Sequence, residues 1–402
     1  MGDNHIKLHY KDFVPVLSGL IGFIALVTSF AYVWAQELSI TNVNFILENV
    51  RMEILIGSVI TLFASIILPN VAPAGTLAPL VVLVPAMSVF GVHPMILGLT
   101  VGLIGFIVVK TGVFMRLVEL AGFTCKTSIT LTFGISGIWM SINKLYSFFS
   151  TKKQIFAALL IILIFVYLLL LYYKIKWLVI PVVALVVFII PYLFHAGFEY
   201  VPVKLNLNLS PFYWWDDMWG IGFGFDVITI LRTIPFTLFV ILLWTIDTVS
   251  IQTIQEASYQ SQEEIEHIDI QQSFLIVAIR NTIGAFCGGA QTGSLWRSFL
   301  IPFYMVKRPM KIGAILLGIG GVISSLTVVP IQVMSYIPLV WSVLLFGIYM
   351  PFTLTAISNI YTNKCKKTNI LIFLFSAFGI GISPILTWIF SVIYDKLDKK
   401  VK

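Results

Sequence analysis

Long, uninterrupted apolar windows constrain this chain more than any other feature of its sequence. Residues 156–173 and 177–194 read FAALLIILIFVYLLLLYY and WLVIPVVALVVFIIPYLF, and each is long enough to cross a hydrocarbon core of about 30 Å as a helix. Similar windows recur along all 402 residues. Only 11% of the residues are charged, against about 25% in ordinary soluble domains. The sequence therefore predicts an all-α polytopic membrane protein.

About fourteen apolar segments are predicted, and several are too short for a full crossing at about 1.5 Å per residue. Short segments interrupted by glycine and proline are typical of transporters with broken helices. The segments lie near residues 13–34, 52–69, 76–92, 95–114, 127–148, 154–173, 177–195, 231–253, 272–287, 294–306, 312–329, 335–358, 369–382 and 384–395.

The charges predict an orientation. The net charge of +7 does not indicate nucleic-acid binding, because Lys and Arg of membrane proteins collect on the cytoplasmic side. Most basic clusters fall on that side if both termini are cytoplasmic, which we expect, in a bacterial inner membrane. The first apolar run lacks a cleavage site and is predicted to be a helix. The connection 201–230, with the aromatic run YWWDDMW, is predicted to lie outside as an interfacial anchor.

Several chemistries lack a sequence signature. The cysteines are Cys125, Cys287 and Cys365, and their spacing supports neither a disulfide framework nor a zinc site. No Walker A motif, no HExxH and no grouping of the Ser–His–Asp type occurs in the sequence. We therefore expect neither an enzyme nor a bound cofactor or metal.

An internal repeat gives the clearest pointer to a site. The stretches APAGTLAPL (72–80) and AQTGSLWRS (290–298) both read A-x-x-G-[T/S]-L, and their glycines, Gly75 and Gly293, are 218 residues apart. The tripeptide FGI recurs 213 residues apart, at 133–135 and 346–348. Two matches at similar spacing favour duplication. An odd number of crossings in each half makes the two repeats inverted, so that broken helices meet at the bilayer midplane.

The two stretches are predicted to begin half-helices near Thr76 and Ser294. Small residues allow a ligand close to the backbone, and a helix start carries unpaired N–H groups that hold an anion. N-capping alone is the alternative role for both hydroxyls.

The run from residue 244 to 300 resembles the sulfate permease (SulP-type) anion transporters. The matching positions are Asp247, Asp269, Gln272, Asn281, Gly284, Ser294, Arg297 and Ser298. The fold of that family, seven plus seven inverted segments, is shared with nucleobase permeases and bicarbonate exchangers. This chain departs from the pattern at Trp296, where a small residue is usual, and it resembles a divergent member without a STAS domain.

The resemblance implies a division into a core domain that carries the substrate and a gate domain that forms a homodimer. The core would comprise 1–122 and 231–330, with the third and tenth helices broken. The gate would comprise 123–200 and 331–402, which ends in the cytoplasmic tail. Transport would then move the core against the gate, as in an elevator.

The candidate substrate site comprises Thr76, Leu77, Gly293, Ser294, Trp296 and Arg297. Arg297 is predicted to bind an anion, and packing against Asp247 is its alternative role. Asp247 lies within an apolar segment, where a carboxylate needs a cavity or a partner, and it is the candidate for proton coupling; a structural hydrogen bond is the alternative.

Three further polar residues are given other roles. Arg280 is predicted to reach the interface or to pair with Asp247 or Glu256, outside the site. Asn281 is predicted to form an interhelical hydrogen bond. His93 is predicted to have a surface role in a helix–helix turn rather than a role in a proton relay.

These features predict a secondary active transporter of a small anion such as sulfate, bicarbonate or an organic anion, driven by protons, by sodium or by exchange. The alternatives are a proton symporter of a nucleobase or another neutral or weakly acidic substrate, and an anion channel. The expected partners are the anion, a coupling ion, membrane lipid and a second copy of the chain, and no nucleic acid.

Overall fold

The computed structural model describes residues 8–68, 70–150, 153–193, 208–259, 268–327, 329–335 and 337–401. Pro69, part of the 201–230 connection and the polar loop 260–267 lie outside the described residues. The elements in chain order are η1 (Tyr10–Asp12), α1 (Phe13–Glu37), α2 (Phe45–Ile67), β1 (Ala74–Thr76), η2 (Ala78–Leu83), α3 (Val84–Val89), α4 (Pro94–Lys110), α5 (Val113–Glu119), α6 (Phe123–Phe148), α7 (Lys153–Tyr172), η3 (Lys176–Leu178), α8 (Val179–Leu193), η4 (Tyr213–Met218), α9 (Val227–Ser258), α10 (Ile270–Phe286), β2 (Gly293–Leu295), α11 (Arg297–Val306), α12 (Met310–Ser325), α13 (Val329–Ser335), α14 (Ile337–Leu344), η5 (Leu345–Tyr349), α15 (Met350–Thr362), α16 (Lys366–Gly381) and α17 (Pro384–Val401).

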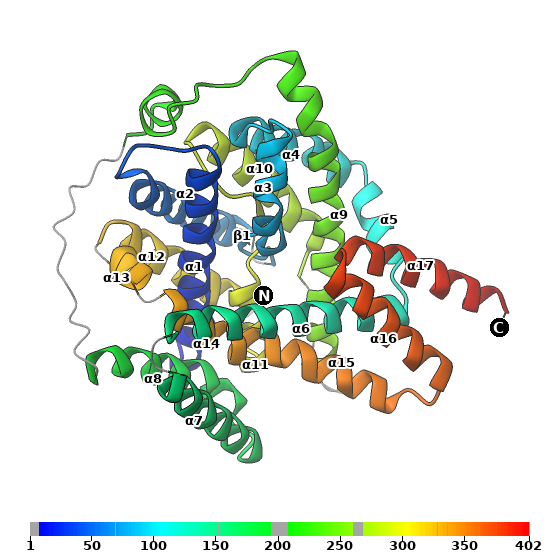
Figure 1. The fold of residues 1–402 in the computed structure, drawn as a ribbon. Helices are drawn as coiled ribbons and strands as arrows, with labels where there is room; N and C mark the ends of the chain where they lie inside the picture. Colours follow the sequence, from blue (N-terminus) through cyan, green and yellow to red (C-terminus); the bar gives the residue numbers. More distant parts are fainter. Residues whose placement is uncertain are drawn as a thin grey trace, which may run out of the picture.

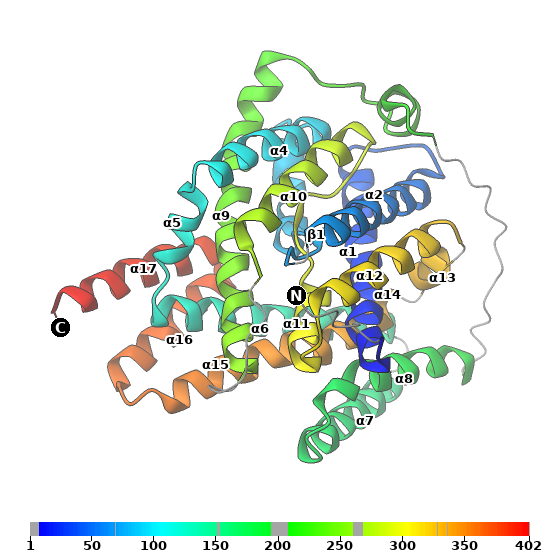
Figure 2. The same ribbon diagram turned by 180° about the vertical axis from the view of Figure 1, so that it is seen from behind.

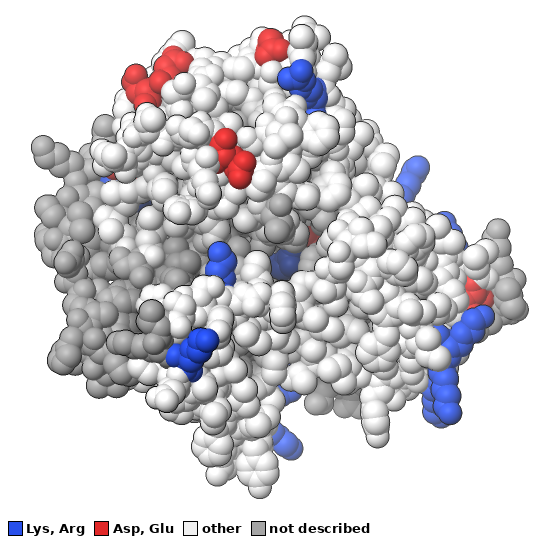
Figure 3. Space-filling model, viewed as in Figure 1, with Lys and Arg blue, Asp and Glu red and all other residues white. Residues whose placement is uncertain are grey.

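The described residues form an all-α polytopic membrane protein. Five helices are long and apolar enough to cross a membrane, and the number rises to six if α4 and α5, bent by 75°, form one span. The predicted count of about fourteen is not confirmed. Two physical reasons account for the difference. Several spans are broken into pieces that are too short to cross a membrane alone. Helix α6 is long enough, with 26 residues, but its many buried serines and threonines make it less apolar. Most of the face in Figure 3 bears no charge, as a lipid-facing surface requires.

The helices pack in two groups. In the first group, α1, α2, α4, α9, α10, α11 and α12 contact one another. In the second group, α6 packs against α14, α15, α16 and α17, and α8 packs against α14. Figure 1 shows most of the first group above α6, with α11 below it, and α15, α16 and α17 of the second group at the lower right; Figure 2 shows the same arrangement from behind. The strands lie within the first group.

The second half of the chain repeats the element order of the first. The spacing between the starts of matching elements is 214 to 219 residues, for α1 and α9, β1 and β2, α4 and α12, and α6 and the continuous helix that begins with α14. Both FGI tripeptides fall in matching places, one in α6 and one in η5.

Two helix pairings cross between the halves. Helix α2 of the first half packs against α12, and α10 of the second half packs against α4. A two-fold axis that exchanges α2 with α10 and α4 with α12 converts one pairing into the other. The strands pair antiparallel, which is the arrangement that such an axis produces.

The third and tenth segments are broken, and each begins as a strand. Half-helices were predicted to start near Thr76 and Ser294, but these residues are extended and belong to β1 and β2. The helical turns start later, at Ala78 in η2 and at Arg297 in α11. The shift arises because both stretches use their backbone groups to pair with each other before either helix begins.

Candidate functional site

The site is built around the pairing of β1 and β2. Gly75 lies opposite Ser294, and Thr76 lies opposite Gly293. The backbone N–H of Leu77 donates to the Thr292 carbonyl at 2.9 Å and so extends the ladder. Because the strands are antiparallel, the chain leaves the pair in opposite directions toward η2 and α11. The two stretches that resemble each other in sequence therefore meet in the structure.

Gly75 allows this close contact. A Cβ added to Gly75 would lie 2.6 Å from the Cα of Trp296, a distance that side-chain movement cannot relieve. Trp296 is held in turn by its backbone N–H, which donates to the Pro73 carbonyl at 2.9 Å. The glycine of the repeated motif is thus required by packing between the two stretches.

Asp247, Ser294 and Arg297 come together in the interior. The Asp247 carboxylate is fully buried; its Oδ2 accepts a hydrogen bond from the Ser294 hydroxyl, and its Oδ1 pairs with Arg297 Nε. The structure thus places Arg297 against Asp247. Both helix starts lack a side-chain cap. N-capping is therefore not the role of either hydroxyl: Ser294 binds Asp247, and Thr76 donates to Gln291 Oε1.

The Arg297 guanidinium lies between the two helix groups. Its side chain is 11% exposed, and among the described residues its Nη2 has no hydrogen-bond partner. On the other side the guanidinium carbon lies 4.4 Å from the centre of the Phe133 ring on α6. Arg297 therefore pairs with a carboxylate of its own group and stacks on an aromatic ring of the other.

Two cavities are lined by Arg297, and a third lies beside them. A small one of about 30 Å³ is lined by Thr76, Trp296 and Arg297, and a larger one of about 400 Å³ also includes Arg297. The third, of about 480 Å³, shares Ala78, Val81 and Met140 with the larger. Figure 3 shows a recess near the middle of this face with a basic side chain at its floor.

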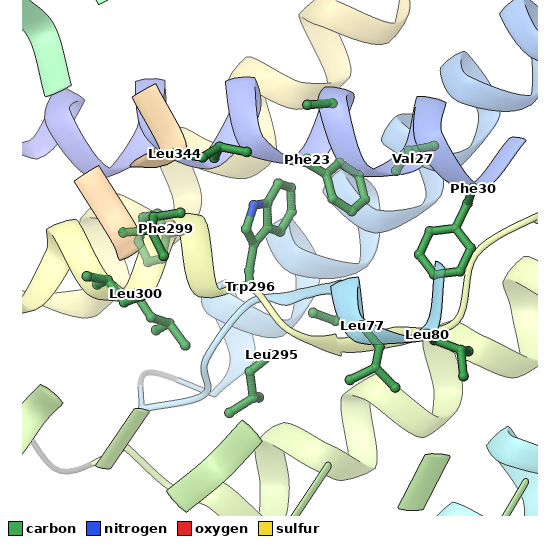
Figure 4. Close-up of a cluster of buried hydrophobic side chains, with 14 of the residues drawn as sticks. Phe23, Val27, Phe30, Leu77, Leu80, Leu295, Trp296, Phe299, Leu300 and Leu344 are labelled. Atoms are coloured by element: carbon green, nitrogen blue, oxygen red, sulfur yellow. The ribbon is translucent and has the colours of Figure 1, made fainter. Parts of the chain in front are cut away.

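The predicted site residues divide into two sets. Thr76, Trp296 and Arg297 line a cavity. Leu77, Gly293 and Ser294 do not appear in these linings and lie behind the surface, where they hold the strand pair or Asp247. Figure 4 shows Leu77 among buried hydrophobic side chains.

Trp296 occupies the space that a small residue would leave open. Its indole Nε1 donates to the Gly19 carbonyl of α1 at 2.9 Å, and its ring lies 4.2 Å from that of Phe23. Figure 4 shows the indole directed from the strand toward α1 and Phe23. The large side chain thus ties the start of α11 to α1.

Sequence reasoning missed Glu53. The Glu53 carboxylate is buried and pairs with Arg280 Nη2 at 2.6 Å. It also accepts hydrogen bonds from the backbone and the side chain of Gln291, at 3.1 and 3.0 Å. The second segment was predicted to start at residue 52, which placed Glu53 at the edge of the segment. Helix α2 instead starts at Phe45, so Glu53 lies in its third turn.

The prediction that Arg280 pairs with Asp247 or Glu256 is wrong. Arg280 pairs with Glu53, and Glu256 pairs with Lys126 at 2.6 Å. A signal was present in the sequence: Glu53 and Arg280 are opposite charges at comparable places in α2 and α10, 227 residues apart. Asn281 was predicted to form an interhelical hydrogen bond, but its Oδ1 accepts from the Gly293 N–H at 2.6 Å, so it joins α10 to the strand β2 instead.

The tryptophans of the YWWDDMW run are not interfacial anchors. Trp214, Trp215 and Trp219 are buried in and beside the π-helical turn η4. The indoles of Trp215 and Trp219 donate to the carbonyls of Ala285 and Gly288, at 2.9 and 2.8 Å. This segment therefore covers the connection between α10 and β2.

His93 lies outside the candidate site. It caps the N-terminus of α4, where its Nδ1 accepts from the Met95 N–H at 3.2 Å. Its Nε2 lies 3.0 Å from the Gly222 carbonyl. Burial lowers the pKa of His93 from 6.5 to about 4, so the imidazole is neutral at physiological pH.

The fold and this buried strand pair define a polytopic α-helical membrane protein with a polar site in its interior. The chain matches the family described as "Protein of unknown function (DUF3360)" over residues 2–399, and it belongs to that family. No curated protein matches it. Among solved structures, the one described as "The overall structure of SLC26A9" is similar, with 12% identity and a TM-score of 0.47 over 96% of this chain. The chain spans 65% of the length of that protein chain.

Proposed function

We propose that the chain is a secondary active transporter of a small anion. One observation carries the proposal: Arg297 Nη2 is a buried N–H group without a hydrogen-bond partner among the described residues, at the start of a broken helix. A buried donor that is left unpaired costs about 1–3 kcal/mol, and an anion in the neighbouring cavities would supply the missing acceptor. The guanidinium would supply the charge that an anion needs.

One face of α6 would line the route from outside to Arg297. Phe133, Gly137 and Met140 line the cavity of about 400 Å³ beside Arg297, and Lys144, one turn further, lines the neighbouring cavity of about 480 Å³. These positions lie three to four residues apart and so share one helix face. Among the described residues that line this neighbouring cavity, Lys144 is the only charged one, which favours the entry of an anion.

Alternating access would come from movement between the two helix groups. We assign the core to 1–122 and 231–330 and the gate to 123–200 and 331–402, related by an inverted repeat. Arg297 belongs to the first group but stacks on Phe133 of the second, so an elevator-like displacement would break this contact. In this proposal the gate forms a homodimer, and both termini are cytoplasmic in a bacterial inner membrane.

Asp247 would couple the anion to a proton. Asp247 already occupies one side of the guanidinium, so an anion competes with it for Arg297. Protonation of Asp247 removes this competition and strengthens anion binding, which is the linkage that symport requires. Sodium near the same carboxylate would act in the same direction.

One observation favours an organic anion or a weak acid over an inorganic ion. The cavity of about 400 Å³ falls in the range of pockets that bind small organic molecules, and most of its lining residues are apolar. A proton symporter of a nucleobase is therefore the second candidate. An anion channel is the third and would conduct without a coupling ion.

The proposal is tested by uptake into proteoliposomes that contain the purified full-length chain. Sulfate, bicarbonate, chloride, dicarboxylates and uracil are offered under an inward proton gradient to wild type, Arg297→Ala, Arg297→Lys and Asp247→Asn. Arg116→Ala serves as the control, because Arg116 is exposed on α5. We expect Arg297→Ala to abolish uptake of one anion and Asp247→Asn to remove its proton dependence. Normal uptake by Arg297→Ala, or uptake of uracil alone, would overturn the anion assignment.

A further inference from the structure

A separate cavity of about 700 Å³ lies away from Arg297. Its lining comes from α7, η3, α8, η5 and α15 of the gate side and from α9 and α11 of the core side. It shares no lining residue with the three cavities near Arg297. In η5, Phe346 and Gly347 line this cavity, whereas Ile348 and Tyr349 line the small cavity beside Arg297. The two cavities therefore lie on opposite sides of η5.

The charged residues that line this cavity, among those that the structure describes, are all basic. They are Lys174, Lys176 and Lys307. All three lysines are exposed at the rim. Lys307 lies above the ring of Tyr259, with its Nζ 5.6 Å from the ring centre, so its charge is held near the opening. Three ammonium groups around one opening attract a phosphate group, whose negative charge is shared between oxygens that accept hydrogen bonds.

The walls of the cavity are apolar. Below the lysine rim the lining is dominated by aliphatic and aromatic side chains, among them Tyr167, Leu171, Ile180, Ile254, Phe346 and Leu354. A small soluble anion would leave this surface in contact with water. A ligand that has an anionic end and a hydrocarbon tail would fill both parts of the cavity.

The position of the rim matches the membrane surface. Lys174 follows the end of α7 at Tyr172, and Lys307 follows the end of α11 at Val306. Ser258, which also lines the cavity, is the last residue of α9. Three helices thus end together at the rim, as helices do where they leave the hydrocarbon core, and the basic residues stand at the level of lipid phosphates.

We propose that this cavity binds one anionic phospholipid, with its phosphate among Lys174, Lys176 and Lys307 and an acyl chain along the apolar wall. Since the cavity is built from both helix groups, the bound lipid links them across η5. The assignment does not depend on the transported substrate, and it is tested without a transport assay.

The experiment measures lipid bound to the purified full-length chain by native mass spectrometry, together with the shift in Tm on adding lipid. Phosphatidylglycerol is compared with phosphatidylcholine, and inorganic phosphate and glycerol 3-phosphate are the soluble alternatives. We expect one phosphatidylglycerol per chain, a rise in Tm with phosphatidylglycerol only, and no effect of the soluble phosphates.

Variants of the lysine rim and of the cavity wall test the two parts of the proposed lipid site separately. A basic residue near an anionic surface contributes about 1 kcal/mol, so each of Lys174→Ala, Lys176→Ala and Lys307→Ala should weaken lipid binding about fivefold. Thr355→Trp narrows the cavity without a change in charge and should also reduce binding, since Thr355 is a half-buried lining residue. The control is the triple alanine variant of Lys364, Lys366 and Lys367, which are exposed and do not line the cavity.

Two results would overturn the proposal. The first is equal loss of lipid in the control triple variant, which would mean that net charge rather than this cavity holds the lipid. The second is a Tm increase with inorganic phosphate or glycerol 3-phosphate and none with phosphatidylglycerol, which would assign the rim to a soluble phosphate. If one lysine variant fails to fold, the other two and Thr355→Trp still decide the question.

Discussion

Arg297 and Asp247 form an ion pair in the interior of the protein, yet Arg297 Nη2 has no hydrogen-bond partner among the described residues. The carboxylate is more completely enclosed than the guanidinium, with 0% of its side chain exposed against 11%. Asp247 also binds Ser294, so it is held from two sides. The pair therefore fixes the arginine at the strand crossing through its Nε and leaves the terminal Nη2 group without an acceptor among the described residues.

The first prediction concerns the energy of this pair. Asp247→Asn and Arg297→Gln each leave one buried charge uncompensated, so each should lower the free energy of unfolding by about 3–5 kcal/mol. The double variant removes both charges and should lose less than the sum, with a coupling of about 0.5–3 kcal/mol. The measurement is thermal unfolding in detergent for all four proteins.

The four proteins form a double-mutant cycle, and the same cycle for the exposed pair Lys126–Glu256 is the matched control. Its two side chains are 27% and 59% exposed, so its coupling should be below about 1 kcal/mol. Equal couplings in the two cycles would contradict the burial argument for Asp247 and Arg297.

The second prediction concerns Glu53, which we expect to support the strand pair rather than to bind substrate. Glu53→Ala removes the acceptor of three donors, two on Gln291 and one on Arg280. The loss should lower the free energy of unfolding by about 3–5 kcal/mol. Glu53→Gln combined with Arg280→Gln should recover part of that loss, because no buried charge is left. Thermal unfolding measures both; a normal Tm with an altered KM would instead assign Glu53 to the substrate.

The third prediction tests the close contact at the strand crossing. Gly75→Ala places a methyl group 2.6 Å from the Trp296 Cα and should force β1 away from β2, at a cost of about 1–3 kcal/mol or more. The control is Gly284→Ala, since Gly284 lies within α10 and an added Cβ would meet nothing within 4 Å. Tm values and the yield of folded protein decide between them, and equal behaviour of the two variants would be the contrary result.

The sequence predicted the parts of the site that repeat. The A-x-x-G-[T/S]-L motif located Gly75 and Gly293, and the structure brings these two stretches into one strand pair. It also identified Asp247 as a buried acid and Arg297 as its possible partner, because charged residues inside apolar segments are few and need partners. Local pattern and composition were sufficient for both.

The sequence did not predict what depends on distant packing. Thr76 and Ser294 were predicted to mark the starts of two half-helices, with N-capping as their alternative role, but strand pairing moved both helix starts. Arg280 had several acidic residues within possible reach; the comparable places of Glu53 and Arg280 in the two halves were a hint, and the packing of α2 against α10 brings the two together. The buried tryptophans of η4 were likewise indistinguishable from interfacial ones by composition.

The fourth prediction concerns Lys144, which lines the cavity of about 480 Å³. If an anion passes this residue on its way to Arg297, Lys144→Glu should raise KM more than Lys144→Ala, by about three- to tenfold, with little change in kcat. The difference should shrink at high salt, where charges more than about 3–8 Å apart are screened. Uptake at two ionic strengths is the measurement, with Lys153→Ala as the control because Lys153 is exposed nearby and lines none of these cavities. A salt-independent KM in all variants would remove Lys144 from the route and leave the role of Arg297 untouched.

The fifth prediction concerns acid sensitivity at His93. Burial holds the pKa of His93 at about 4, whereas an unfolded histidine titrates near 6.5, so the unfolded state binds the extra proton first as pH falls. The contribution to stability is thus complete above pH 6.5 and is lost between about 6.5 and 4, by up to about 3 kcal/mol. His93→Asn retains a side chain suited to capping α4 but cannot titrate in this range, so its Tm should fall less steeply over the same interval. Parallel Tm–pH curves for wild type and His93→Asn would show that other groups account for the acid sensitivity, because the imidazole would then contribute no proton linkage.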